Sequence, residues 1–339
     1  MIDLSDTQLM TRAAWLYYVG GLNQEAAAAR MGITRARVNR LLQQARESGL
    51  VSITINANDI GLLPVEDAIR AAYGLDFCIA TPAYGLTDAE RAANPQLAAL
   101  PIRTVGAAAA RYLRETLASK PDAVVGTGWG RTLAQMSRQM AGTSAPRSRF
   151  VSLMGSLTAN SAFNPFEVVQ SLAQATGGEG FFLPVPFIAD SAQDRETLLA
   201  QQTVAKALKL ARYTDLAMIS VGELTQTSLL RRQGMISAEE LMALREAGAV
   251  GDTNGIFFDA RGRPVQHDLN HRTIAVGFED LRRSTTVVLA AGAEKIAATR
   301  ALLASGIARG MIVDGDTACI LAEAISPGVS KGAVVQPKP

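Results

Sequence analysis

Downstream of residue 62 the chain alternates short apolar runs with longer amphipathic stretches. The runs have the length of buried strands, and the stretches between them repeat apolar residues at helical spacing. Strands that alternate with helices predict a doubly wound α/β fold, with a mostly parallel sheet covered on both faces. The predicted strands are Phe77–Ala80, Ala123–Gly126, Phe150–Met154, Leu216–Val221, Ile256–Phe258, Thr286–Ala290 and Met311–Val313. The predicted helices are Val65–Tyr73, Leu97–Ala118, Arg131–Ala141, Glu167–Ala175, Glu196–Ala211, Ala238–Ala247, Ala293–Ala304 and Asp316–Ile325.

Upstream, residues 6–48 show helical spacing only, which predicts a three-helix head. The first helix covers residues 6–20, and we expect Trp15, Leu16 or Tyr17 to pack beneath the third helix. Stacking of these aromatic rings on bases is a weaker interpretation, because a protein that reads a duplex meets no unstacked base.

The second and third helices of the head have the spacing of a DNA-binding helix-turn-helix. Asn23 and Thr34 are the expected N-caps, since their side-chain oxygens can accept bonds from free backbone N–H groups. Gly32 can adopt the left-handed conformation that ends the second helix. Ala28 is small enough for a close helix crossing, and Val38 begins the apolar face of the third helix.

The other face of the third helix is basic, and residues 26–46 contain five arginines and no acidic residue. Arginine can bond guanine bidentately, and asparagine can bond adenine in the same way. We expect Arg35, Ala36 and Asn39 to contact base edges, and Arg37 and Arg40 to contact mainly phosphates, beside the cap Thr34. The alternative is a solvated amphipathic helix whose arginines have no partner.

Turn-forming residues place the boundary between the two parts of the chain. Residues 49–55 alternate apolar and polar positions, which indicates a short strand that forms a wing or begins the connection. The predicted organisation is a head over residues 1–56, a hinge over 57–61, a ligand-binding α/β domain over 62–325 and a flexible tail over 326–339.

Composition excludes several classes of protein. The 339 residues are 48% hydrophobic and 19% charged with a net charge of +2, so any DNA contact depends on the local basic face. Cys78 and Cys319 are too few for a disulfide framework, and no apolar segment reaches membrane-spanning length. The N-terminus has no signal-peptide pattern, so a cytoplasmic location is expected.

The segment AVVGTGWGRTL after the second predicted strand is the strongest ligand-binding pattern in the body. Glycines let backbone amides approach an anion, and a helix N-terminus presents free N–H groups to it. Thr127, Arg131 and Thr132 add hydroxyl and guanidinium donors to this turn. The GxGxG spacing differs from the dinucleotide-binding GxGxxG, and a structural turn is the competing interpretation.

Three further strand ends carry polar residues. Asp252, in the segment GAVGDTNG, is expected at a turn, where it either accepts bonds from sugar hydroxyls or acts as an ordinary turn former. Lys295 lies one turn inside a predicted helix, where it can reach a phosphate or stay solvated. Asp316 is expected to be the N-cap of the last helix.

Metal, cofactor and His-based catalytic sites are not expected. His267 and His271 are four residues apart, but the surrounding PVQHDLNH is interpreted as a loop and no cysteine or carboxylate cluster completes a ligand set. The chain also has no Gly-x-Ser-x-Gly nucleophile elbow.

Several ordered motifs together resemble the SorC family of sugar-binding transcriptional regulators, over nearly the whole chain. The resemblance rests on NQEAAAARMGITRARVNRLLQQARESGLV in the head and on six segments of the body: GTGWGRTL, SLMGS, LPVPF, VGEL, GAVGDTNGIFFDARGRPV and AAGAEKIAATRALL.

The resemblance implies a body that is similar to sugar-phosphate isomerases and glucosamine-6-phosphate deaminases in fold. It also implies operator DNA as a partner, a phosphorylated sugar or polyol as effector, and assembly as a tetramer or dimer. The effector positions that it implies are Gly126, Thr127, Gly128, Gly130, Arg131, Thr132, Asp252 and Lys295. Trp129 lies within the same turn, where it and Arg131 replace the hydroxyl-rich turn of some sugar-phosphate binders, so a free sugar alcohol is the other expected effector.

An enzyme with an appended DNA-binding head is the alternative from another functional class. Isomerases of this fold carry an Asp-rich motif and a Lys-Gly-rich loop in a fixed order, and residues 314–316 only faintly resemble the first of these.

Overall fold

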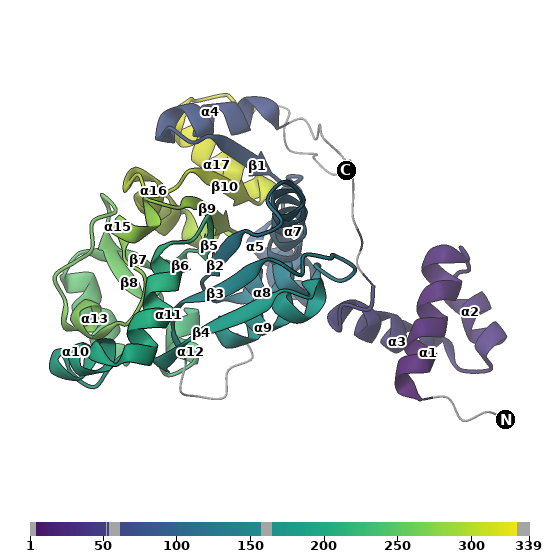
Figure 1. Ribbon diagram of the computed structural model, residues 1–339. Coiled ribbons are helices and arrows are strands. Elements are labelled where there is room, and N and C mark those ends of the chain that lie inside the picture. Colours follow the sequence, from purple (N-terminus) through teal and green to yellow (C-terminus); the bar gives the residue numbers. More distant parts are fainter. Residues whose placement is uncertain (1–4, 52, 54–61, 157–164, 331–339) are drawn as a thin grey trace.

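The computed structural model describes residues 5–51, 53, 62–156 and 165–330. Within these ranges the chain forms a small helical head and a larger α/β body (Figure 1). The head contains α1 (Asp6–Ala14), a π-helical turn η1 (Trp15–Val19), α2 (Gln24–Met31) and α3 (Arg35–Glu47).

The predicted caps of the helix-turn-helix are confirmed. The Asn23 side chain accepts a hydrogen bond from the backbone N–H of Ala26 at 2.9 Å, and the Thr34 hydroxyl accepts one from the N–H of Arg37 at 3.2 Å. Gly32 has a φ of 68°, in the left-handed region that a glycine adopts without strain. These local interactions fix the turn that places α3 against α2.

The predicted core of the head is correct except for Trp15. The apolar face of α3, which includes Val38 and Leu42, packs with Ala13 and Ala27. Trp15 is 63% exposed, whereas Leu16 and Tyr17 pack against that core. Trp15 lies two residues after the buried Ala13, about 200° around the helix from it, so its side chain points away from α3.

The body is built on a parallel sheet of seven strands in the order β1-β10-β9-β5-β2-β3-β4, which confirms the predicted fold class. A second, antiparallel sheet has the order β6-β7-β8. The strands are β1 (Phe77–Ala80), β2 (Val124–Thr127), β3 (Arg149–Ser156), β4 (Glu179–Pro186), β5 (Leu216–Ser220), β6 (Gly222–Glu223), β7 (Ala249–Thr253), β8 (Ile256–Asp259), β9 (Thr285–Ala290) and β10 (Gly310–Val313).

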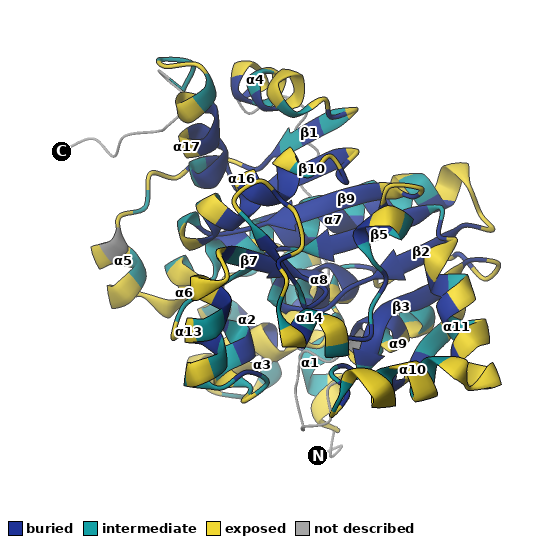
Figure 2. Cartoon of the chain, turned by 90° about the vertical axis from the view of Figure 1, so that its left-hand side faces the viewer, coloured by how far each residue is buried: buried dark blue, intermediate teal, exposed yellow. Residues whose placement is uncertain are grey.

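Helices cover both faces of the parallel sheet (Figure 2). Alternate residues of each strand face opposite layers, so Leu216 and Met218 pack with α7–α9 while Ala217 and Ile219 pack with α4, α11, α16 and α17. The helices of the body are α4 (Leu63–Tyr73), α5 (Asp88–Ala93), α6 (Pro95–Ala98), α7 (Leu100–Ser119), α8 (Arg131–Arg138), α9 (Pro165–Thr176), α10 (Ala192–Ala200), α11 (Gln202–Arg212), α12 (Leu229–Arg232), α13 (Ala238–Glu246), α14 (Asp268–Arg272), α15 (Phe278–Leu281), η2 (Ala293–Lys295), α16 (Ile296–Ala304) and α17 (Gly315–Ile325).

Three strands were not predicted, and two predicted helices are interrupted. β4 contains Pro184 and Pro186, which argue against a strand in sequence but are tolerated here because β4 lies at the edge of the sheet. β6 and β7 belong to the small sheet and lack a long apolar run. The helix expected over 97–118 divides into α6 and α7, and that expected over 196–211 divides at Gln201, whose backbone is extended.

Two local predictions near the chain's C-terminal half are wrong. Asp314, not Asp316, caps α17, and its carboxylate accepts a bond from the N–H of Thr317 at 3.0 Å. The carboxylate of Asp316 instead accepts bonds from the N–H groups of Tyr84 and Gly85, at 2.9 and 2.8 Å. The segment around His267 is not entirely a loop, because His267 caps the short helix α14.

The proposed boundaries fall largely on residues outside the described ranges. The hinge over 57–61 and tail residues 331–339 lie outside them, while residues 326–330 form a turn. Of the strand expected over 49–55, residues 49–51 and 53 are described and none of them is in a strand. Among the residues that the structure describes, no helix is both long and apolar enough to cross a bilayer.

Candidate effector pocket and DNA-binding face

The strand order creates one point at which the chain changes direction across the parallel sheet. After β2 the chain continues to β3 on one side, whereas after β5 it continues to β9 on the other side. The loops that leave β2 and β5 therefore separate at the carboxyl edge of the sheet. Ligands of open α/β sheets bind in the crevice at such a point.

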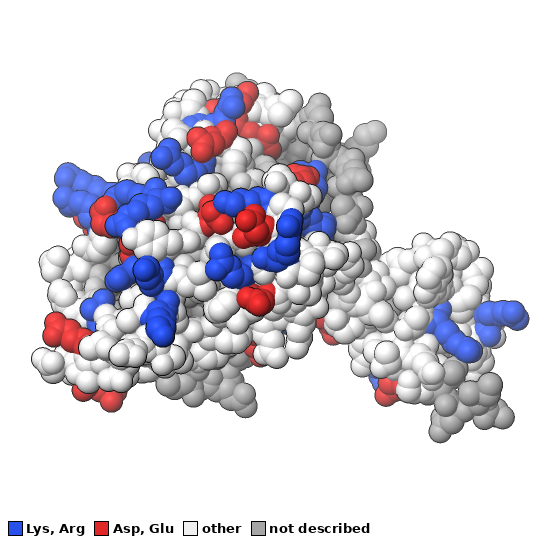
Figure 3. Space-filling view, viewed as in Figure 1, with Lys and Arg blue, Asp and Glu red and all other residues white. Residues whose placement is uncertain are grey.

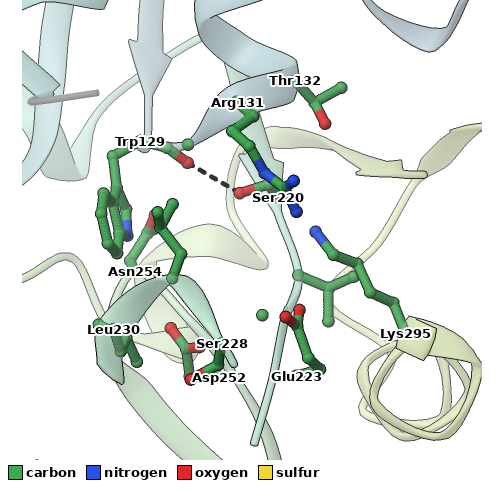
Figure 4. Close-up of a pocket in the computed structure, with 14 residues that line it drawn as sticks. Trp129, Arg131, Thr132, Ser220, Glu223, Ser228, Leu230, Asp252, Asn254 and Lys295 are labelled. Atoms are coloured by element: carbon green, nitrogen blue, oxygen red, sulfur yellow. Dashed lines mark hydrogen bonds between the residues drawn. The ribbon is translucent and has the colours of Figure 1, made fainter. Parts of the chain in front are cut away.

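A pocket lies at this position, between the ends of β2, β5 and β9 and the small sheet (Figure 4). It is narrow, with about 40 Å³ free for water inside an envelope of about 500 Å³ that includes the solvent at its mouth. A sugar-sized ligand therefore requires the long side chains of the lining to rotate. The lining residues are Trp129, Gly130, Arg131, Thr132, Ser220, Val221, Gly222, Glu223, Ser228, Leu229, Leu230, Asp252, Asn254 and Lys295.

The loop after β2 directs the N-terminus of α8 into the pocket. Gly130, the residue before α8, has a φ of 120°, which strongly favours glycine. The hydroxyl of Ser220 donates a hydrogen bond to the carbonyl of Trp129 at 2.8 Å and so ties this loop to the end of β5. The first N–H groups of α8 and the side chains of Arg131 and Thr132 thus converge on one end of the pocket.

Two cations approach each other at that end (Figure 4). Lys295 is only 9% exposed, and within the described ranges neither Lys295 nor Arg131 has a carboxylate within ion-pair distance. Burial lowers the pKa of Lys295, and the charge of Arg131 adds to this effect, whereas the charges of Glu223, Glu294 and Asp252 oppose it. Unpaired cations at a helix N-terminus form a site for an anion.

Asp252 provides a buried carboxyl group in the same pocket. It is 4% exposed, and burial raises its pKa to about 7, with the charge of Glu223 acting in the same direction. A bond accepted from the N–H of Gly255 at 3.1 Å and the charge of Lys295 oppose that rise. Near neutral pH this group can therefore accept hydrogen bonds as a carboxylate or donate one as an acid.

The structure brings together six of the nine residues that the sequence suggested for the effector. Trp129, Gly130, Arg131, Thr132, Asp252 and Lys295 line the pocket. Gly126, Thr127 and Gly128 do not line it. Gly126 is a close-packing position in β2, where a Cβ would lie 2.5 Å from Leu153, and the backbone of Gly128 lies against the side chain of Asn254. Asp252 lies in strand β7 rather than at the turn itself, which Asn254 and Gly255 form.

Sequence reasoning missed several pocket residues. Ser220 is the last residue of β5 and Glu223 lies in the short strand β6 that follows, so the segment SVGEL marks the end of a strand as the glycine-rich turn does. Asn254 is the first residue of an Asn-Gly hairpin turn, a pattern that predicts a turn but not a ligand contact. Ser228 precedes the four-residue helix α12, which has no helical periodicity to reveal it.

The predicted DNA-contacting residues lie on the outer face of α3. Arg35, Ala36, Arg37, Asn39 and Arg40 are all exposed, as is the capping residue Thr34. Arg37 lies 4.0 Å from the carboxylate of Asp6, and the side-chain oxygen of Asn39 accepts a bond from Gln24 at 3.3 Å. These contacts at the surface leave the basic face open to solvent.

Basic residues also occur outside this face. Arg46, the last arginine of α3, donates a hydrogen bond to the hydroxyl of Tyr18 at 2.9 Å and so joins α3 to the π-helical turn η1. On the visible face of the body, basic and acidic side chains are intermixed (Figure 3). Among the described residues, no three His, Cys, Asp or Glu side chains gather closely enough to hold a metal ion.

Comparisons with known proteins agree on one family. The family model described as "Putative sugar-binding domain" matches residues 61–322. The erythritol catabolism regulatory protein EryD of Brucella abortus is 36% identical over 93% of this chain and 96% of its own length. The deoxyribonucleoside regulator of Bacillus subtilis is 30% identical over 94% of this chain and 98% of its own length.

A solved structure supports the same fold. The full-length sorbitol operon regulator SorC from Klebsiella pneumoniae superposes with a TM-score of 0.67 at 21% identity, covering 94% of this chain and 99% of SorC. The match extends through both the head and the body. This chain therefore belongs to the SorC family of transcriptional regulators that carry the sugar-binding domain.

Proposed function

We propose that this protein regulates transcription of a sugar or polyol catabolic operon. In this proposal α3 binds operator DNA, and a phosphorylated sugar or sugar alcohol in the pocket controls that binding. The names of the relatives support a regulator, and they do not support the alternative of a sugar-phosphate isomerase or deaminase. EryD in particular is named for erythritol catabolism, which makes a short polyol a reasonable first candidate.

The observation that carries the proposal is the anion site at the switch point. Arg131, Lys295 and the N-terminus of α8 face one end of the pocket, and the two cations have no ion pair among the described residues. A phosphate group would offset the cost of burying Lys295 beside Arg131. This arrangement favours a phosphorylated effector over a free sugar alcohol.

The proposal includes a homo-oligomer, either a dimer or a tetramer. A helix-turn-helix reads only a few base pairs, so regulators of this type pair two heads on a two-fold symmetric operator. The affinity for the operator, and its change when the effector binds, then depend on the spacing between the two heads of an assembly.

The experiment is fluorescence anisotropy with labelled DNA from the region upstream of the protein's own gene. We expect binding that a scrambled duplex of equal length does not reproduce, and a change in affinity on adding one member of a defined panel. The panel is erythritol, sorbitol, erythritol 4-phosphate and sorbitol 6-phosphate, with a thermal-shift assay in parallel. Binding without sequence preference would refute the DNA-binding proposal, and absence of any shift with the whole panel would refute erythritol, sorbitol and their terminal phosphates as effectors.

A further inference from the structure

Two polar side chains in the pocket have hydrogen-bonding groups that the protein does not use. Asn254 is 2% exposed, and neither its amide nitrogen nor its amide oxygen has a hydrogen-bond partner. Ser228 is 1% exposed, and its hydroxyl is likewise without a partner. Both residues line the pocket. Since buried polar groups are nearly always hydrogen-bonded, two such groups facing one cavity indicate a ligand that bonds them.

The turn that carries Asn254 is held in place by hydrogen bonds of the neighbouring residues, and the Asn254 side chain takes part in none of them. The hydroxyl of Thr253 donates to the carbonyl of Ser220 at 2.9 Å, and the N–H of Gly255 donates to Asp252 at 3.1 Å. The side-chain oxygen of Asn254 lies against Gly128, where an added Cβ would come within 2.4 Å of it. The amide is therefore presented from a fixed backbone rather than from a mobile loop.

The position of these groups divides the pocket into two ends. Arg131 and Lys295 point toward each other on one side, whereas Asn254 lies beside Trp129, with Ser228 and Asp252 nearby (Figure 4). The first end attracts an anion. The second offers an amide that must both donate and accept, and a hydroxyl that can do either.

Only certain chemical groups can form hydrogen bonds with both Asn254 and Ser228. A phosphate at neutral pH accepts hydrogen bonds but has few protons to donate, so it would leave the Asn254 oxygen without a donor. A hydroxyl group both donates and accepts, and neighbouring hydroxyls can bond the amide oxygen and nitrogen together. An unsubstituted alkyl chain would satisfy neither atom.

We propose that Asn254 and Ser228 recognise hydroxyl groups of the effector, at the end of the pocket opposite the anion site formed by Arg131 and Lys295. This inference rests on the proposed function and specifies how the effector lies in the pocket. The effector class is a polyhydroxylated chain with a terminal phosphate, whose hydroxyl-bearing end contacts Asn254.

The test compares erythritol 4-phosphate, n-butyl phosphate and inorganic phosphate by isothermal titration calorimetry, using the full-length protein. The variants are Asn254→Gly, which preserves the positive φ of 49°, and Ser228→Ala. Thr299→Val is the matched control, because Thr299 is fully buried in α16, its hydroxyl has no partner, and it does not line the pocket. Thermal unfolding without ligand checks that each variant is folded.

We expect each pocket variant to bind erythritol 4-phosphate at least 10-fold more weakly than the wild type, while affinity for inorganic phosphate and butyl phosphate stays within 3-fold. Thr299→Val is expected to match the wild type with all three probes. Equal affinity of wild type and both pocket variants for erythritol 4-phosphate would overturn this inference alone. If the wild type binds inorganic phosphate but gains nothing from the hydroxyls of erythritol 4-phosphate, the inference also fails. If the wild type binds none of the probes, the anion site and this inference both fail, whereas the anisotropy experiment tests the DNA-binding proposal separately.

Discussion

The surroundings of Asp252 favour the neutral form of its carboxyl group. Burial raises its pKa from 3.8 to about 7, with Glu223 adding to the rise and Lys295 opposing it. Between these two values the unfolded chain releases the proton and the folded chain keeps it. The contribution of Asp252 to the free energy of unfolding therefore falls as the pH rises from about 4 to about 7, and is constant above that range.

Replacing Asp252 by asparagine should remove this dependence. We expect the difference in unfolding free energy, wild type minus Asp252→Asn, to fall by up to about 1.4 kcal/mol for each pH unit between pH 5 and pH 7. Comparing the two proteins cancels the titration of groups that they share. Urea unfolding at several pH values measures the difference, and parallel profiles would show that the Asp252 carboxyl is already ionised in the folded protein.

Arg35 and Arg40 share the exposed face of α3 but are expected to act differently. Arg35 begins the helix, at the end that enters the major groove. Arg35→Ala should therefore weaken the free energy of operator binding by about 1–3 kcal/mol and relax the base preference at one position. Arg40→Ala should weaken binding to all DNA sequences alike, and it should reduce the slope of log affinity against log salt concentration by about one. Anisotropy titrations with single-base operator variants at several salt concentrations separate the two effects. Identical behaviour of the two variants would contradict the assignment.

At the scale of elements, α8 is the helix on which the anion site depends. Gly130, the residue preceding it, has a φ of 120° and faces the pocket. Gly142 also has a positive φ, of 78°, but no atom lies within 4 Å of a Cβ added there, and it does not line the effector pocket. A Cβ added at Gly130 would lie 3.3 Å from the Ser220 hydroxyl, so the two glycines share a positive φ but differ in their contacts with the pocket lining.

Gly130→Ala and Gly142→Ala should both lower stability by about 1–3 kcal/mol, because alanine is strained at positive φ. Only Gly130→Ala should also weaken effector binding, by turning the first N–H groups of α8 away from the anion. Thermal unfolding and calorimetry with inorganic phosphate on both variants provide the comparison. Equal phosphate affinity for the two variants would mean that α8 does not hold the anion.

The elements that the sequence predicts well are those with a strong period. Buried strands such as β9 and capped helices such as α3 are specified locally, so their residues predict them closely. β4 is a strand only because it lies at the edge of a sheet formed by distant residues, and its two prolines conceal it. The π-helical turn over Trp15–Val19 has no recognisable signal in the sequence.

Only part of the pocket could be predicted from the sequence. Arg131 and Lys295 follow strand-like runs, so each was a reasonable candidate alone, yet only the order β9-β5-β2 brings them together. That order depends on packing across the whole body. Asn254 and Ser228 become visible as ligand contacts only when burial shows that their polar atoms have no partner in the protein.

At the scale of the whole molecule, the DNA-binding face and the pocket must be coupled for regulation. Coupling between two binding sites is reciprocal at equilibrium, so operator DNA must change effector affinity by the same factor as effector changes DNA affinity. We expect this factor to lie between about 5-fold and 150-fold. Anisotropy with and without erythritol 4-phosphate gives one factor, and calorimetry with and without operator duplex gives the other. A factor of one in both measurements would mean that the pocket does not regulate DNA binding.

The distribution of tryptophan makes both halves of this coupling observable without a label. The chain has two tryptophans, Trp15 and Trp129. The indole of Trp15 faces water on the head, whereas that of Trp129 is 6% exposed in the wall of the pocket. Their fluorescence should therefore differ in emission wavelength and in quenching by iodide. With Trp15→Phe or Trp129→Phe, the emission of the remaining indole reports on one site at a time, so the order of the two binding events can be followed by stopped-flow mixing.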